Sequence, residues 1–157
     1  MTITYTIISF IIALGILITF HEFGHYLVAR WSGVKVLRFC IGFGHPIFRR
    51  RWGKDQTEWV IAAIPLGGYV KMLDENEGKV AIEDLPRSFN RQPVARRFAI
   101  VAAGPIANFL LAIVLYWFLF ILGVHGMKPV LGPVEPSTAA AYAKFEAGET
   151  IVSIENE

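Results

Sequence analysis

Two long apolar stretches without a charged side chain constrain the fold of this chain most strongly. The first runs from Ile3 to Phe20 and the second from Phe98 to Val124. An α-helix rises about 1.5 Å per residue, so helices over these stretches, the first continuing to Ala29, can cross a bilayer core of about 30 Å. With 54% hydrophobic residues, the chain is too apolar for an ordinary soluble domain. The sequence therefore predicts a membrane protein, mainly α-helical, with two transmembrane helices.

The basic residues indicate the orientation in the membrane. Thirteen of the fifteen Lys and Arg residues lie from Arg30 to Arg97, between the two apolar stretches. Because basic loops stay on the cytoplasmic side, we expect residues 32–97 in the cytoplasm and the N-terminus outside. Acidic residues mixed in from Asp55 to Asp84 argue against a nucleic-acid partner. The first stretch lacks the basic start of a secretory signal, so we interpret it as a retained helix.

The sequence His21-Glu22-Phe23-Gly24-His25 ends the first helix's apolar run. Residues four apart share a helix face, so both imidazoles could bind one Zn²⁺ at about 2.0–2.1 Å. Glu22 lies about 100° round the helix, where it could accept a proton from a water molecule activated by the metal. These three residues predict a zinc site with Glu22 as the catalytic base. The alternative is that the polar groups only reach toward the membrane surface at a helix end.

The segment after Ser32-Gly33, where the first helix should end, has the alternation of β-strands. Strands are expected over 34–39, 57–64 and 69–73, with a break at 42–46 and a turn at 65–68. The run Arg49-Arg50-Arg51-Trp52 suits a lipid headgroup surface. We expect a small β-hairpin region against the cytoplasmic leaflet. An unwound substrate could add to an edge at 57–64 or 69–73. The single cysteine, Cys40, is expected to be a small buried residue.

The remaining polar features leave alternatives open. Residues 74–93 are expected to form a solvated acidic loop, although a carboxylate there could serve as a third zinc ligand. Asn108 is the only strongly polar side chain of the second helix. Pro105 should bend that helix, and Gly104 should permit close approach of another helix. Asn108 either faces the zinc site or the peptide, or hydrogen-bonds between helices. After Gly126 we expect an edge strand over 129–135, a short helix over 137–145 and a strand over 151–154.

Four motifs in this order resemble the site-2 intramembrane zinc metalloproteases, and within them the bacterial regulator-of-sigma-E protease branch. They are His21–His25, Ile41-Gly42-Phe43-Gly44, Pro65-Leu66-Gly67-Gly68-Tyr69-Val70-Lys71-Met72 and Ala103-Gly104-Pro105-Ile106-Ala107-Asn108-Phe109. The resemblance implies zinc-dependent cleavage of transmembrane segments, with anti-sigma factors as substrates. It makes Gly67, Gly68, Tyr69 and Asn108 candidates for binding substrate or supporting the site. The tail resembles the start of a PDZ domain, with Glu149 where an aspartate is usual.

The resemblance also implies a domain order and a location. A first transmembrane helix (1–31) precedes a cytoplasmic loop (32–97), a second helix (98–125) and an incomplete extracytoplasmic PDZ-like domain (126–157). The location implied is the bacterial inner membrane. The family's third zinc ligand, an aspartate in a later helix, has no counterpart here, so the chain looks like an N-terminal portion and is expected to be weak or inactive alone. The alternatives are a non-catalytic scaffold that binds a partner, and a metal transporter, which the nearly apolar second helix argues against.

Overall fold

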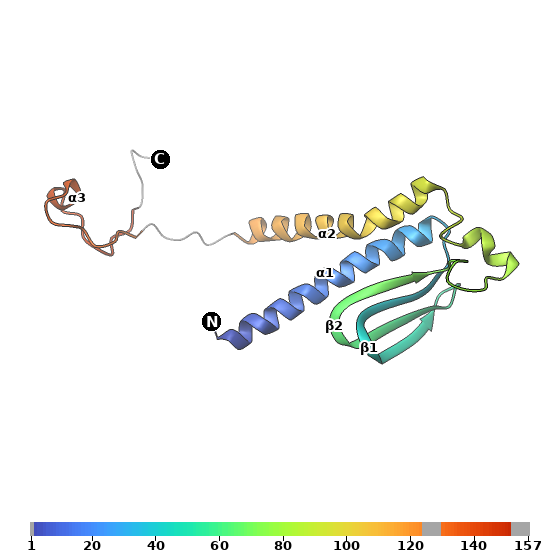
Figure 1. Cartoon of the computed structure of the whole chain (residues 1–157). Coiled ribbons are helices and arrows are strands. Elements are labelled where there is room, and N and C mark those ends of the chain that lie inside the picture. The colour runs from blue at the N-terminus through green and yellow to red at the C-terminus, as the bar shows by residue number, and fades with distance from the viewer. Residues whose placement is uncertain (1, 124–129, 152–157) are drawn as a thin grey trace. The chain divides into compact units, whose positions relative to one another are not determined.

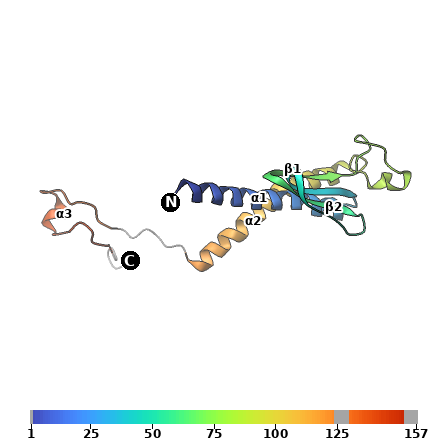
Figure 2. The same ribbon diagram turned by 90° about the horizontal axis from the view of Figure 1, so that it is seen from below.

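The computed structural model describes residues 2–123 and 130–151. The chain folds into α1 (Ile3–Trp31), β1 (Val36–Trp52), β2 (Thr57–Met72), a 3₁₀ helix η1 (Ile82–Arg87), α2 (Val94–Leu122) and α3 (Ala139–Tyr142). Residues up to Tyr116 form one compact unit and the residues after it a second. Figures 1 and 2 show the hairpin of β1 and β2 beside the C-terminal half of α1.

Both predicted helices are present. Helix α1 ends at Trp31, with Ser32 as its cap and Gly33 at a φ of 82°, as the sequence predicted. Helix α2 begins at Val94, directly after Pro93 and four residues before the predicted start. Both helices are long and apolar enough to cross a membrane, with mean hydropathies of 2.3 and 2.4 in their most apolar stretches. Protein buries none of this apolar stretch in α1 and only 17% of the corresponding stretch in α2. Such exposed apolar surfaces are expected to contact lipid rather than a protein core.

The hairpin differs from the prediction at its two glycine-rich points. Each strand continues through the predicted break at 42–46 or the predicted turn at 65–68. The strands bend there instead, and the pairing register shifts. Gly42 has a φ of 86° and Gly67 a φ of 109°, values that side chains other than glycine rarely adopt. The glycines therefore bend two long strands rather than end them.

Because the strands bend, they pair with each other in three stretches. Residues 38–41 pair with 68–71 on one side and with 58–61 on the other, and 58–61 pair in turn with 48–51. The four segments thus lie in the order 68–72, 36–41, 57–62 and 46–52. Of the two predicted edges, 57–64 or 69–73, the first is wrong, because residues 58–61 have a neighbour on each side. The outer segments are 68–72 and 46–52.

The base of the hairpin is attached to α1, α2 and η1. A buried apolar cluster joins the end of α1 to the first residues of β1 and to α2, through Ala29, Val34, Val36 and Ile100. Asp55, in the β1–β2 turn, accepts from Arg30 and Arg87 at 2.8 Å each, although its side chain is only 8% exposed. Asp84 of η1 pairs with Lys35 at 2.5 Å. The hairpin is therefore fixed against the C-terminal end of α1.

The polar segment after β2 is less irregular than predicted, because η1 lies within it. In the tail, the short helix is present as α3, and Thr138 caps it by accepting from the Ala141 amide. Val130 and Thr150 form an antiparallel bridge. Val130 lies within the predicted strand 129–135, and Thr150 directly precedes the predicted strand 151–154. Most of the second of these strands, and Pro129 of the first, lie outside the described residues.

Candidate metal centre

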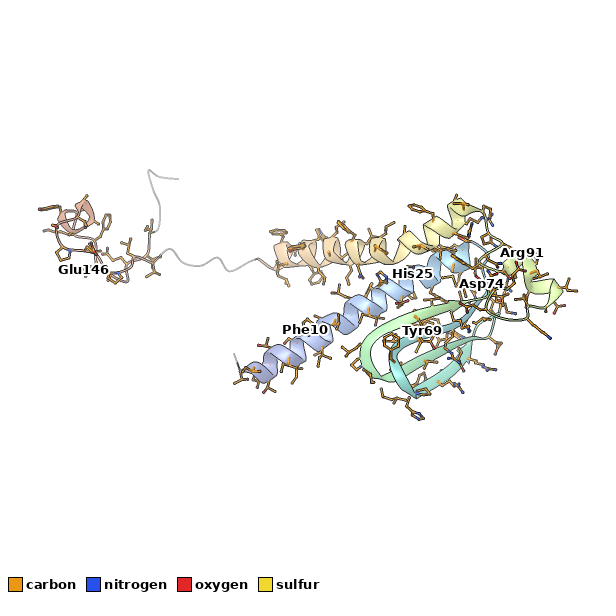
Figure 3. The ribbon with its side chains drawn as sticks, in the orientation of Figure 1. Phe10, His25, Tyr69, Asp74, Arg91 and Glu146 are labelled. Carbon is orange, nitrogen blue, oxygen red and sulfur yellow. The ribbon has the colours of Figure 1, made fainter. Side chains whose placement is uncertain are left out.

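His21 and His25 face the same side of α1, as their spacing predicted. Their ring centroids are 4.8 Å apart and the rings stand nearly perpendicular, at 84°. Four residues of helix bring successive side chains to one face, one turn apart. Both rings lie on the side of α1 that meets α2, and Figure 3 labels His25 between the two helices.

A backbone carbonyl of α2 orients His25. Nδ1 of His25 lies 2.7 Å from the Ile100 carbonyl oxygen. A carbonyl oxygen can only accept, so Nδ1 carries the proton and donates it. The other ring nitrogen, Nε2, is then left as a lone-pair donor. Such a hydrogen bond fixes both the tautomer and the ring plane, as in histidines that bind zinc.

Gly104 of α2 lies directly opposite both free nitrogens. A Cβ added at this residue would clash with Nε2 of His25 and would lie 2.7 Å from Nε2 of His21. Two imidazole nitrogens therefore converge beside a backbone position that has room for no side chain. Imidazole is a preferred zinc ligand, so this pair of donors fits zinc. The sequence predicts close helix approach at Gly104, which the structure confirms, but not that the neighbours are the two histidines.

Glu22 points to another neighbour, the bent part of β2. A Cβ added at Gly68 would lie 2.9 Å from Cγ of Glu22 and 3.3 Å from the Ile18 side chain. The helix thus presents two histidines to α2 and the intervening glutamate to the sheet, as expected for positions about 100° apart. The site is built where α1, α2 and β2 meet.

The other predicted site residues are placed differently. Gly67 lies against the Phe43 ring, and Gly68 against Glu22. Tyr69 packs with Cys40, Val60 and Ala62, and its hydroxyl accepts from Arg38 at 3.1 Å. Because neighbouring strand residues face opposite sides, Tyr69 points away from the side on which Gly68 meets α1.

Asn108 follows Gly104 by one helical turn. Its Oδ1 is buried and has no hydrogen-bond partner among the residues that the structure describes. The predicted helix–helix hydrogen bond is therefore not seen at this oxygen. A buried acceptor without a donor costs about 1–3 kcal/mol, which is a reason to expect a partner from outside these residues.

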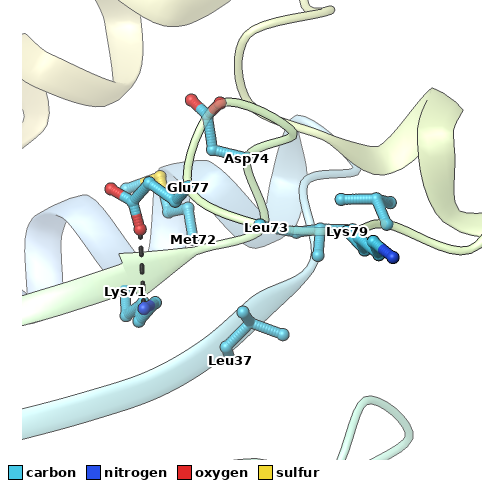
Figure 4. A pocket seen from close by; sticks show the side chains of 9 residues that line it. Leu37, Lys71, Met72, Leu73, Asp74, Glu77 and Lys79 are labelled. Carbon is cyan, nitrogen blue, oxygen red and sulfur yellow. Dashed lines mark ion pairs between the residues drawn. The ribbon is translucent and has the colours of Figure 1, made fainter.

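The acidic loop offers no third ligand within the described part of the chain, where no three His, Cys, Asp or Glu side chains are grouped to hold a metal. Its carboxylates have other partners: Glu75 accepts from Asn90 at 2.7 Å, and Glu77 pairs with Lys71 at 3.5 Å. Figure 4 shows that pair at a hollow of about 110 Å³, which none of the site residues lines.

Cys40 is buried, 3% exposed, as the sequence predicted. Burial raises the pKa of its thiol above the ordinary value, although the hydrogen bond with Tyr69 and the charge of Arg38 oppose this. A buried thiol that stays protonated is a poor nucleophile, so Cys40 packs rather than reacts.

A histidine pair and an adjacent glutamate on a membrane-length helix are the pattern of a class of proteins, the zinc metalloproteases. Residues 9–155 match the family model of peptidase family M50. The chain belongs to this family of metalloproteases and is a membrane protein.

Named relatives agree with this assignment. Protease RseP of Yersinia pestis is 54% identical over 155 residues, which cover 99% of this chain and 34% of the relative. A putative zinc metalloprotease of Neisseria meningitidis is 53% identical over 150 residues, 96% of this chain and 33% of the relative. Regulator of sigma-E protease RseP of Escherichia coli is 52% identical over 147 residues, 94% of this chain and 32% of the relative. The chain spans about a third of the length of these curated relatives.

Proposed function

We propose that this chain carries the zinc-binding and proton-transfer residues of a protease that hydrolyses peptide bonds within membrane segments. The observation that carries the proposal is the convergence of two histidine nitrogens on Gly104, with Glu22 held against Gly68 beside them. His21 and His25 would hold zinc, and a third ligand would come from residues outside those described. Zinc bound there would polarise a peptide carbonyl and make a water molecule more acidic.

Glu22 then acts as the general base and acid. Its carboxylate takes a proton from the attacking water and delivers it to the leaving amine. The contact with Gly68 holds the Glu22 side chain between helix and sheet, so its reach is restricted before substrate arrives. Asn108 would accept a hydrogen bond at its buried Oδ1 from the substrate or from the remaining site residues.

The substrate would bind in extended form along residues 68–72. A helix hides its carbonyls in internal hydrogen bonds, so a transmembrane segment must unwind before cleavage. An outer strand segment offers the backbone donors and acceptors that the unwound segment then needs. Residues 68–72 form an outer segment of the sheet, and Gly68 adjoins Glu22, which supports this edge.

We further propose a bacterial inner-membrane location. The N-terminus and the PDZ-like tail would lie outside the cytoplasm and residues 32–97 on the cytoplasmic side. The basic residues of the loop and the apolar surfaces of α1 and α2 support this placement. Two of the relatives bear names that refer to RseP, one of them as a regulator of sigma-E, which supports membrane-bound anti-sigma factors as substrates.

Glu22→Gln in the full-length protein tests the proposal. We expect cleavage of a membrane-protein substrate to fall by at least about a hundredfold, because the amide cannot accept the proton, while zinc content stays near one per chain. His21→Ala with His25→Ala should remove both zinc and cleavage.

A second candidate is a non-catalytic scaffold, favoured by the presence of only two metal-ligand side chains at the site in the described residues. If Glu22→Gln cleaves as fast as the wild type, the scaffold is correct and the protease assignment of these residues is wrong. Zinc bound equally by the double histidine variant would likewise contradict the proposed site.

A further inference from the structure

The outermost segment of the sheet carries a groove that the proposed chemistry does not use. Phe48, Arg50 and Trp52 alternate along β1 and lie beside Trp59 of β2, and the four residues line an open hollow of about 390 Å³. This volume falls within the range of ordinary small-molecule sites. The lining combines three aromatic rings with one guanidinium.

Arg50 has no ion pair or side-chain hydrogen bond among residues 2–123 and 130–151. The preceding residue, Arg49, does have a partner: on the opposite face of the sheet it forms an ion pair with Glu58 at 2.7 Å. A guanidinium has five donors in a planar fork that matches a phosphate or carboxylate. An unpaired guanidinium in a groove therefore favours an anionic ligand.

The aromatic residues of the groove favour a ligand with an apolar part. Trp52 is 71% exposed and Phe48 is 50% exposed, both unusual for large rings facing water. Tryptophan is enriched where membrane and water meet, because its ring is apolar and its N–H is polar. The groove thus has both elements of a lipid-contacting surface.

The attachment of the hairpin gives the depth of the groove. The β1–β2 turn, next to Trp52, is tied to Arg30 near the end of α1. Across the sheet, Phe48 pairs with Ile61, Ile61 with Ile41, and Ile41 with Gly68. Gly68 in turn lies beside the Ile18 side chain, so Phe48 is level with Ile18 of α1. At about 3.3 Å per residue, Phe48 lies about 13 Å further along the strand than Trp52. The groove therefore runs from the headgroup level into the acyl region if α1 spans the bilayer.

We propose that this groove binds one anionic phospholipid of the cytoplasmic leaflet. The lipid phosphate would accept from Arg50, next to Trp52, and an acyl chain would lie against Phe48 and Trp59. Because Arg50 is positively charged, the groove should prefer anionic to zwitterionic lipid. This proposal rests on the membrane placement given above, and it adds a bound lipid that holds the outer edge of the sheet at a fixed depth.

The test compares two neighbouring arginines of equal charge. The full-length protein in detergent is titrated with phosphatidylglycerol or with phosphatidylcholine, and bound lipid is counted by native mass spectrometry. Arg50→Gln should weaken phosphatidylglycerol binding about fivefold, the effect of one basic residue at a membrane surface, and leave phosphatidylcholine unchanged. Arg51→Gln removes the same charge from the opposite face, where Arg51 lines a different hollow, and should change binding less than twofold.

Arg50→Lys keeps the charge without the planar fork and should restore part of the binding. Equal losses in Arg50→Gln and Arg51→Gln would overturn the proposal in favour of diffuse surface charge. No loss in either variant would also overturn it, because the lipid phosphate would then not be held by Arg50. Zinc content and cleavage, measured on the same preparations, should stay unchanged in Arg50→Gln. Glu22→Gln should bind lipid normally, so a failed protease assignment is distinguishable from a failed lipid site.

Discussion

The contact between α1 and α2 and the base of the hairpin are held together in opposite ways. Between the helices, Gly24 and Gly104 leave no room for a side chain. The backbone of α1 at Gly24 meets the backbone of α2, and the backbone of α2 at Gly104 meets the two histidine rings. At the base, Asp55 joins Arg30 to Arg87, and Asp84 holds Lys35. Hydrocarbon penalises charge, so small residues are the favoured contact there, whereas ion pairs are tolerated where water is near.

The difference separates two tasks of this chain. The helix contact sets the positions of the two histidine nitrogens, and the hairpin base sets the position of the sheet beside Glu22. Substitutions that fill space between the helices should therefore affect metal binding first. Substitutions at the charged base should affect the attachment of the sheet and leave the metal site largely intact.

Gly104→Ala should break the helix contact most strongly. The new Cβ would overlap with Nε2 of His25 and crowd that of His21, so the helices must separate or a ring must turn. We expect zinc affinity to fall about a hundredfold, at the upper end for altered support of metal ligands, and cleavage to fall with it. Zinc is measured by competition with a chelator in the full-length protein.

Gly15→Ala is the matched control for Gly104→Ala. Gly15 is also a helical glycine of a membrane helix, but a Cβ there would meet no atom within 4 Å. Zinc affinity should therefore stay within twofold of the wild type. Equal zinc loss in both variants would contradict the role given to Gly104, because it would point to a general effect of replacing helix glycines.

Gly68→Ala should sharpen the comparison by separating chemistry from metal binding. Its Cβ would lie 2.8 Å from the Cys40 carbonyl oxygen and 2.9 Å from Cγ of Glu22, so Glu22 must shift. We expect kcat to fall at least about tenfold with zinc content unchanged, because displacing a catalytic group by about 1 Å slows the reaction strongly. Gly78→Ala, where a Cβ meets nothing within 4 Å, should leave kcat unchanged.

Asp55→Asn tests the charged base. The amide cannot neutralise Arg30 and Arg87, both about a third exposed, so part of the loss is relieved by water. We expect a loss of about 1–2 kcal/mol in the stability of the hairpin attachment, less than for a fully buried pair. Hydrogen exchange of residues 36–72 measures it, and zinc content should hold. Glu77→Gln, which removes an exposed ion pair at 3.5 Å, should change exchange little.

The sequence predicts the membrane-length helices and the shared face of the two histidines well, because both follow from local patterns. The uncharged stretches gave α1 and α2, and the spacing of His21 and His25 put both rings on one face. The helix start at Val94 was missed because Arg96 and Arg97 were interpreted as lying before the helix. The bent strands were missed because Gly42 and Gly67 can end a strand or bend it, and only the pairing of 38–41 on both sides decides.

The close contacts of the site could not be derived from one sequence. Nothing local at Gly104 says that its neighbour is a pair of imidazoles, because that depends on how α2 packs on α1. The His25–Ile100 hydrogen bond joins residues 75 positions apart. Tyr69 was grouped with Gly68 as a site candidate, yet alternation along the strand puts the two on opposite faces. Long-range packing, rather than propensity, decides such contacts.

The smallest expected effect is the pH dependence of the exposed contact between Glu75 and Arg91. The hydrogen bond from Arg91, and then that from Asn90, hold the pKa of Glu75 below its ordinary value of 4.5. A lowered folded pKa means that this contact stabilises the loop above pH 4.5, and that the contribution is lost as the pH falls through the folded pKa. The protection of residues 74–92 against hydrogen exchange, corrected for the intrinsic pH dependence of exchange, should therefore fall slightly below pH 4.5. Glu75→Gln should abolish that change, whereas Asp55→Asn should leave it in place. An unchanged pH profile in Glu75→Gln would contradict this prediction and assign the titration to a different carboxylate.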